Sequence, residues 1–156
     1  MSMIMYLLAV LMMVIIDQAV KYWAVTMLAS IGTIPLVPGV LSLTYVENRG
    51  AAFSILENQI WLFVALAAAI LCAIVYALSK NKIQAPIGKI SLLVVAAGAI
   101  GNVIDRIVNH YVVDMIQLEF IRFPIFNIAD IYVCVGIALF AFYYLFIHKD
   151  PEDEEK

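Results

Sequence analysis

Residues Ile60–Ser79 read IWLFVALAAAILCAIVYALS, an unbroken run without a charged side chain, and this run decides the fold class. A helix needs about 20 mostly apolar residues to cross the hydrocarbon core of a bilayer. Three other stretches meet the same requirement, so the sequence predicts an all-α integral membrane protein with four transmembrane helices. The predicted spans are Ile4–Met27, Ile60–Ser79, Ile90–Val108 and Ile128–Ile147.

The composition agrees with this class. Of the 156 residues, 65% are hydrophobic and 13% are charged, whereas soluble domains are about 45–50% apolar and about 25% charged. No basic patch accompanies the net charge of −3, so we expect no nucleic-acid partner. We interpret the first span as retained rather than as a signal peptide, because it lacks a basic N-terminal region and contains Asp17 and Lys21.

The segment between the first two spans, Gly32–Gln59, is not membrane-like. Pro and Gly residues interrupt it, and Val40–Val46 is β-branched and partly alternating in polarity. This pattern predicts a short strand or hairpin at the membrane surface, a small cradle-like β element outside the cytoplasm between the first two helices.

Loop charges predict the orientation of the chain. The short loop between the second and third spans, with the start of the third helix, carries Lys80, Lys82 and Lys89, which favours the cytoplasmic side. Both termini are then cytoplasmic, and residues 150–156 form an acidic cytoplasmic tail. The other two loops face outward. We find no internal repeat and no second domain.

Two aspartates, Asp114 and Asp130, lie in apolar sequence at the edges of predicted spans. An ionisable group inside a membrane costs on the order of 3 kcal/mol, so such a residue is a functional candidate by default. Two carboxylates that approach each other can share a proton and perform acid–base chemistry. The outward loops place both aspartates at the outer leaflet.

Other polar residues stand near the same membrane boundary. Asp17 and Lys21 are four residues apart and predict an ion pair on the first helix, with Lys21 free to extend toward the membrane surface. Their role is either to neutralise each other or to support a site. Asn48 offers amide donors and an acceptor, and Gly50 permits close backbone approach.

The third span ends in a polar group beside small residues. Ala97 and Gly101 form a face for close helix packing. Asn102 and Arg106 share one helix face, which packing alone does not explain. Arg106 either pairs with Asp17 or holds a substrate carbonyl, and the sequence leaves both open. The role of Asp105 is open too.

The fourth span opens with Asn127 and Asp130, the pattern of a helix N-cap followed by an acid three residues later. Asp130 alone is therefore explained by capping. The combination with Asp114, Asn102 and Asn48 favours a site, because polar groups from separate segments are costly at this depth unless they meet.

In chain order, the motifs resemble those of bacterial lipoprotein signal peptidase, the type II signal peptidase. The motifs are Asp17-Gln18-x-x-Lys21, Asn48-x-Gly50-Ala51-Ala52-Phe53, Gly98-x-x-Gly101-Asn102-x-x-Asp105-Arg106, Val112-Val113-Asp114 and Phe126-Asn127-x-Ala129-Asp130.

The resemblance implies an aspartic endopeptidase of the bacterial cytoplasmic membrane. Its substrates would be prolipoproteins, cleaved just before a diacylglyceryl-modified cysteine, with membrane lipids as the other partners. Residues 1–149 would form one four-helix peptidase domain, which we expect to be a monomer. The implied catalytic residues are Asp114 and Asp130, and the implied supporting residues are Asn48, Gly50, Asn102, Arg106, Asn127, Asp17 and Lys21.

We expect no metal or organic cofactor. His110 and His148 stand outside any ligand-spaced cluster, and Cys72 and Cys134 are interpreted as small buried apolar residues. Two other functions are compatible with intramembrane acids. A proton-coupled transporter predicts acids near the middle of the bilayer and an internal repeat. A non-catalytic scaffold predicts that neither aspartate is needed for function.

Overall fold

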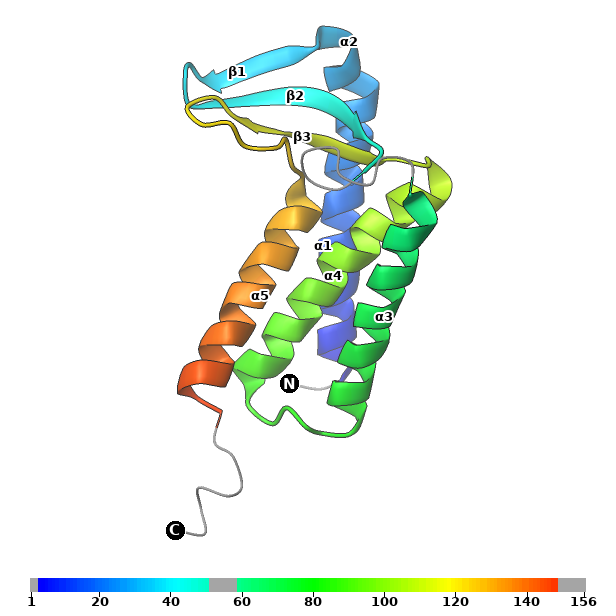
Figure 1. The fold of residues 1–156 in the computed structure, drawn as a ribbon, viewed down its shortest axis with the longest axis vertical. Coiled ribbons are helices and arrows are strands. Elements are labelled where there is room, and N and C mark those ends of the chain that lie inside the picture. Colours follow the sequence, from blue (N-terminus) through cyan, green and yellow to red (C-terminus); the bar gives the residue numbers. More distant parts are fainter. Residues whose placement is uncertain (1–2, 51–58, 149–156) are drawn as a thin grey trace.

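The computed structural model describes residues 3–50 and 59–148 of the chain. Within this part, four apolar helices form a bundle that carries a small antiparallel sheet at one end (Figure 1). The helical elements are α1 (Met3–Trp23), η1 (Ala24–Leu28), α2 (Ala29–Ile31), α3 (Ile60–Ser79), α4 (Pro86–Val108) and α5 (Ile128–Phe146). The strands are β1 (Thr33–Val37), β2 (Leu41–Asn48) and β3 (Val112–Leu118). The predicted fold class is confirmed.

Helix α4 is the central element, because it packs against α1, α3 and α5. Small residues allow this, as predicted from Ala97 and Gly101. Ala97 is fully buried. A Cβ atom added to Gly98 would meet the carbonyl oxygen of Ala129, and one added to Gly101 would meet the Asp17 carboxylate. Close packing of this kind holds helices together where lipid is as apolar as the side chains.

The first helix is longer than predicted. The π-helical segment η1 and the short α2 carry it to Ile31, and Gly32 ends it with a φ of 88°. The third predicted span, α4, also begins earlier than predicted, at Pro86. Proline fits the first turn of a helix, because a backbone N–H at that position has no hydrogen-bond partner within the helix.

The sheet has the strand order β1-β2-β3. Its hairpin confirms the strand prediction over Val40–Val46, but β3 was missed. The first four residues of β3, Val112 to Met115, are all buried. A strand buried on both faces has no polar alternation, so its sequence cannot be told from a short apolar run.

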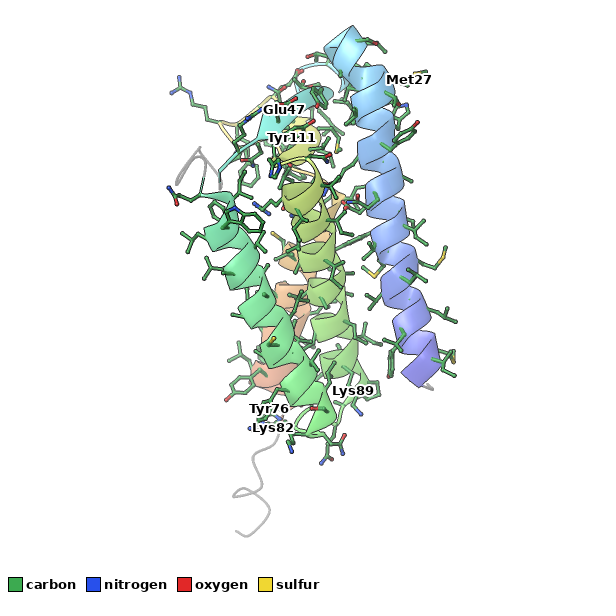
Figure 2. The ribbon with its side chains drawn as sticks, turned by 90° about the vertical axis from the view of Figure 1, so that its right-hand side faces the viewer. Met27, Glu47, Tyr76, Lys82, Lys89 and Tyr111 are labelled. Carbon is green, nitrogen blue, oxygen red and sulfur yellow. The ribbon has the colours of Figure 1, made fainter. Side chains whose placement is uncertain are left out.

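The end of the bundle opposite the sheet carries the other connections. The first turn of α1, the loop between α3 and α4, and the last turn of α5 all lie there (Figure 1). Tyr76, Lys82 and Lys89 lie at this end, whereas Met27, Glu47 and Tyr111 lie at the sheet end (Figure 2). The two loops with the candidate site residues are therefore on the side away from the lysines.

The exposure of the two cysteines differs from the prediction. Cys72 and Cys134 were expected to be buried, but both are free and exposed. They lie on outer helix faces, which in a membrane protein contact lipid and are as apolar as the interior. Residues 150–156 of the predicted tail lie outside the described residues, as do Ala51, Ala52 and Phe53 of the second motif.

We expect Gly98→Ala to destabilise the bundle by about 1–3 kcal/mol, because overpacking forces a shift. The new Cβ would press on α5 backbone, which has little freedom to move. Thermal unfolding in detergent measures the change. The control is Val135→Ala on the outer face of α5, where the side chain is 47% exposed. Equal melting temperatures for both variants would contradict the close packing of α4 on α5.

Candidate active site

The two aspartates predicted to meet lie on adjacent elements. Asp114 is in the middle of β3, is 2% exposed, and Asp130 is in the first turn of α5. Asp114 and Asp130 are brought together because β3 is hydrogen-bonded to the segment that precedes α5. The N–H groups of Met115 and Ile116 both donate to the carbonyl oxygen of Phe126, at 3.1 and 2.8 Å.

Asn127 connects the two carboxylates directly. Its side-chain amide donates to Asp114 Oδ1 at 2.6 Å, and its backbone N–H donates to Asp130 Oδ2 at 3.1 Å. The Asn127 side chain also accepts from the N–H of Asp130, which completes the predicted N-cap of α5 as a capping box. The residue that starts the helix thus also aligns the aspartate pair.

Two other asparagines bind the remaining carboxylate oxygens. Asn48 Nδ2 donates to Asp114 Oδ2, and Asn102 Nδ2 donates to Asp130 Oδ1, each at 2.8 Å. Every oxygen of the pair therefore accepts a hydrogen bond. These donors come from β2, α4 and the start of α5, so three separate parts of the chain orient the pair.

The side chains that donate to Asp114 are neutral amides, and the nearby Lys21 lowers its pKa less than these hydrogen bonds do. Burial raises the pKa of the Asp114 carboxyl to about 7, and nearby Asp130 raises it as well, while hydrogen bonds from Asn48 and Asn127 act in the opposite direction. A carboxyl group whose pKa is raised in this way can hold a proton near neutral pH.

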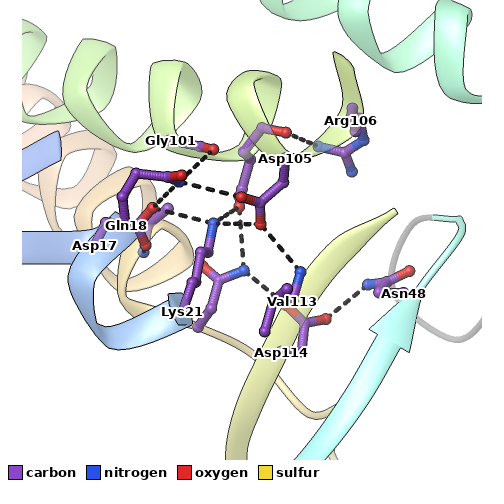
Figure 3. A network of polar contacts seen from close by, with 12 residues as sticks. Asp17, Gln18, Lys21, Asn48, Gly101, Asp105, Arg106, Val113 and Asp114 are labelled. Atoms are coloured by element: carbon purple, nitrogen blue, oxygen red, sulfur yellow. Dashed lines mark hydrogen bonds and ion pairs between the residues drawn. The ribbon is translucent and has the colours of Figure 1, made fainter. Parts of the chain in front are cut away.

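A buried ionic cluster lies beside the pair (Figure 3). Lys21, which is 3% exposed, contacts Asp17 Oδ2 at 3.1 Å, Asp105 Oδ2 at 3.0 Å and Asn102 Oδ1 at 2.9 Å. The predicted pair of Asp17 and Lys21 is confirmed. The expectation that Lys21 extends to the surface is wrong, because two carboxylates and an amide oxygen occupy its three N–H donors inside the bundle.

The sequence did not assign Asp105 or Gln18 to this cluster. Asp105 Oδ2 accepts the backbone N–H of Val113, next to Asp114, at 3.0 Å, and Asp105 Oδ1 accepts from Gln18 Nε2 at 3.1 Å. The available signal was helical spacing. Asp105 lies three and seven residues after Asn102 and Gly98, on the stripe of α4 that faces the other helices.

Arg106 lies on the outer side of the same helix end. Its guanidinium group donates to the carbonyl oxygens of Asn102 and Gly50, at 3.3 and 3.5 Å. Its central carbon lies 5.0 Å from the centre of the Phe63 ring. Arg106 does not pair with Asp17, whose partners are Lys21, Gln18 and the N–H of Ala129. Of the two alternatives for Arg106, the pairing with Asp17 is therefore excluded.

The described residues contain no group of three or more His, Cys, Asp or Glu side chains that is arranged to hold a metal ion. What the arrangement offers chemically is a hydrogen-bonded carboxyl pair, one member of which exchanges its proton near neutral pH. Such a pair can remove a proton from water and donate one to a carbonyl oxygen.

Comparison with known proteins agrees with this chemistry. The family model of signal peptidase (SPase) II matches residues 9–146. A lipoprotein signal peptidase of Streptococcus thermophilus is 47% identical over 131 residues, which are 84% of this chain and 86% of that protein. A lipoprotein signal peptidase of Streptococcus pyogenes serotype M6 is 41% identical over 134 residues, which are 86% of this chain and 88% of that protein.

Solved structures show the same fold. A bacterial membrane enzyme structure determined by the in meso method at 2.3 Å resolution has a TM-score of 0.85 and 32% identity, covering 92% of this chain and 88% of that chain. A second such structure, at 1.9 Å resolution, has a TM-score of 0.84. The chain belongs to the signal peptidase II family, the membrane-bound aspartic peptidases that remove signal peptides from prolipoproteins.

Proposed function

We propose that Asp114 and Asp130 are the catalytic pair of this peptidase. The observation that supports the proposal is that Asn127 donates to both carboxylates, from its side chain and its backbone, and so sets their relative position. If Asp130 served only to cap α5, the hydrogen bond from Asn127 to Asp114 would not be needed.

One proton is shared by the pair before reaction. The ionised carboxylate takes a proton from a water molecule as the water oxygen bonds to the scissile carbonyl carbon, while the protonated partner donates to the carbonyl oxygen. The carboxylate that gave up its proton then takes one from a hydroxyl of the tetrahedral diol as the C–N bond breaks, and the other carboxyl group protonates the leaving nitrogen, so that the pair again holds one proton. No covalent bond to the enzyme forms. We assign the shared proton to the pair as a unit, because interacting carboxyl groups titrate together.

The substrate approaches along one face of the sheet. Residues at positions 114, 116 and 118 of β3 point to the same face because side chains alternate along a strand. Asp114 is paired with Val46, Ile116 with Leu43, and Leu118 with Leu41. This half-buried apolar row suits a signal peptide cut just before its diacylglyceryl-modified cysteine. Arg106 and Asn48 are placed to hold the peptide backbone.

The orientation in the membrane follows from the lysines at the end opposite the site. Lys80, Lys82 and Lys89 favour the cytoplasm, and this supports the proposal that both termini are cytoplasmic and that the aspartate pair faces the outer leaflet of a bacterial cytoplasmic membrane. We propose that residues 1–149 form one domain and that it works as a monomer.

Asp114→Asn and Asp130→Asn should each lower cleavage of a diacylglyceryl-modified lipobox peptide by a factor of about 10³ or more, since each removes a group that moves a proton. Rates of purified, reconstituted protein measure this, and thermal unfolding checks that both variants fold. Glu119→Gln is the matched control, because this carboxylate is bound to Gly39 at the far end of the sheet. Near-normal rates in both aspartate variants would make the pair structural.

The pH dependence follows from the raised pKa of Asp114, about 7. Below this pH the pair keeps its shared proton, and above it the proton is lost together with the general acid. We therefore expect kcat/KM to fall as pH rises through about 7, approaching a tenfold loss per unit. A profile measured on the free enzyme, with Glu119→Gln as control, tests this. Constant kcat/KM up to about pH 9 would contradict a shared proton.

Asp105 positions Asp114 through the backbone N–H of Val113. We expect Asp105→Asn to lower kcat by about tenfold to a hundredfold with a smaller change in KM, because small displacements of a catalytic group are costly. Ser91→Ala is the control, since Ser91 is equally buried on α4 but bonds only to the carbonyl oxygen of Gly88. If both variants lose stability alike and keep full kcat, Asp105 is merely structural.

A further inference from the structure

The free end of the sheet carries an exposed apolar surface, which we call the sheet tip. It consists of the turn between β1 and β2 with its flanking strand residues, and of the segment that follows β3. Each large apolar side chain of the sheet tip is between 45% and 60% exposed. They are Leu36, Val37, Val40, Phe120, Ile121 and Phe123.

The two segments form one built surface. The N–H of Gly39 donates to the Glu119 carboxylate at 2.8 Å, and the N–H of Glu119 donates to the carbonyl oxygen of Val40 at 3.0 Å. The ring of Phe123 packs edge-on against Phe126, with 5.8 Å between ring centres. Phe126 in turn is bonded to β3. The exposed side chains therefore project from a fixed scaffold.

The height of the sheet relative to the membrane follows from the first helix. The apolar helix Ile4–Ile31 has 28 residues, about 42 Å at 1.5 Å per residue, whereas the hydrocarbon core is about 30 Å thick. Its last turns thus rise into the headgroup layer, where β1 begins directly after them. Tyr22 and Trp61, 72% and 68% exposed at this end of the bundle, belong to the aromatic belt that marks the interface.

Figure 1 shows the turn between β1 and β2 extending sideways past the first turn of α5. In a bilayer that surrounds the bundle, lipid would lie below this part of the sheet. Contiguous apolar patches of this kind are uncommon on surfaces that face water. Arg122 is exposed among the apolar residues, and within the described residues it has no ion-pair partner.

We propose that the sheet tip is a membrane anchor, which inserts Phe120, Ile121 and Phe123 into the lipid–water interface beside the bundle and places Arg122 at the level of the lipid phosphates. The apolar side chains lose contact with water, and the guanidinium group gains an anionic partner. Because the tip is continuous with β3, the anchor also fixes the height of Asp114 relative to the bilayer. The anchor does not depend on the catalytic assignment.

The test is the depth of a nitroxide spin label in nanodiscs of phosphatidylcholine and phosphatidylglycerol. Cys72 and Cys134 are first replaced by alanine, and the label is then attached at Ile121→Cys. Val75→Cys, 64% exposed on α3, is the lipid reference, and Lys82→Cys in the opposite loop is the water reference. We expect the label at position 121 to relax faster with oxygen than with a water-soluble nickel complex, as at position 75.

A second label, at Val40→Cys, tests whether the aromatic segment holds the tip down. Replacing Phe120 and Phe123 by serine should move this label toward the accessibility of the water reference. Omitting phosphatidylglycerol, or introducing Arg122→Gln, should shift it in the same direction by a smaller amount. A label at position 121 that matches Lys82→Cys would overturn the anchor. A label shielded from both reagents would also overturn it, because a protein surface would then cover the tip.

Discussion

A buried lysine shared by two carboxylates is the interaction on which the site depends. Lys21 lies in the apolar bundle, where an unpaired charge costs several kcal/mol, so each of its N–H groups must find an acceptor. The acceptors lie on α1 and α4, and they in turn bind β3 through Asp105 and α5 through Asp17. One cation thus determines how four elements sit around the aspartate pair.

The arrangement separates two electrostatic environments that lie side by side. The ionic cluster contains Lys21, whereas the side chains that donate hydrogen bonds to the pair are the neutral amides of Asn48, Asn102 and Asn127. Asn102 stands at the border, because its oxygen accepts from Lys21 and its nitrogen donates to Asp130. Lys21 already lowers the pKa of Asp114, as the last in order of the causes that act on it, and a direct contact would favour the ionised carboxylate more strongly, against the shared proton that the proposed mechanism requires.

The features that depend on local sequence could be predicted, whereas those that depend on contacts between distant segments could not. The spans, the pairing of Asp17 with Lys21 and the cap at Asn127 follow from length and local spacing, which sequence records directly. Strand β3 and the role of Asp105 depend on contacts between distant segments. A fully buried strand lacks alternation, and Asp105 next to Arg106 is indistinguishable from a helix-end acid until Val113 is seen to donate to it. The π-helical extension of α1 likewise had no local signal.

The level of the aspartate pair follows from what hydrolysis requires. In the proposed mechanism the reaction consumes water, while a substrate with acyl chains is held in lipid, so the depth that offers both is the membrane interface. Asp130 lies in the first turn of a candidate spanning helix and Asp114 lies on a strand outside the candidate spans, which agrees with the depth that the proposal requires. A transporter would instead need its acids near the middle of the bilayer, with access from both sides. The sheet over the bundle end fits the same requirement, because the proposal gives its apolar face to a lipid-borne peptide and its outer side to water.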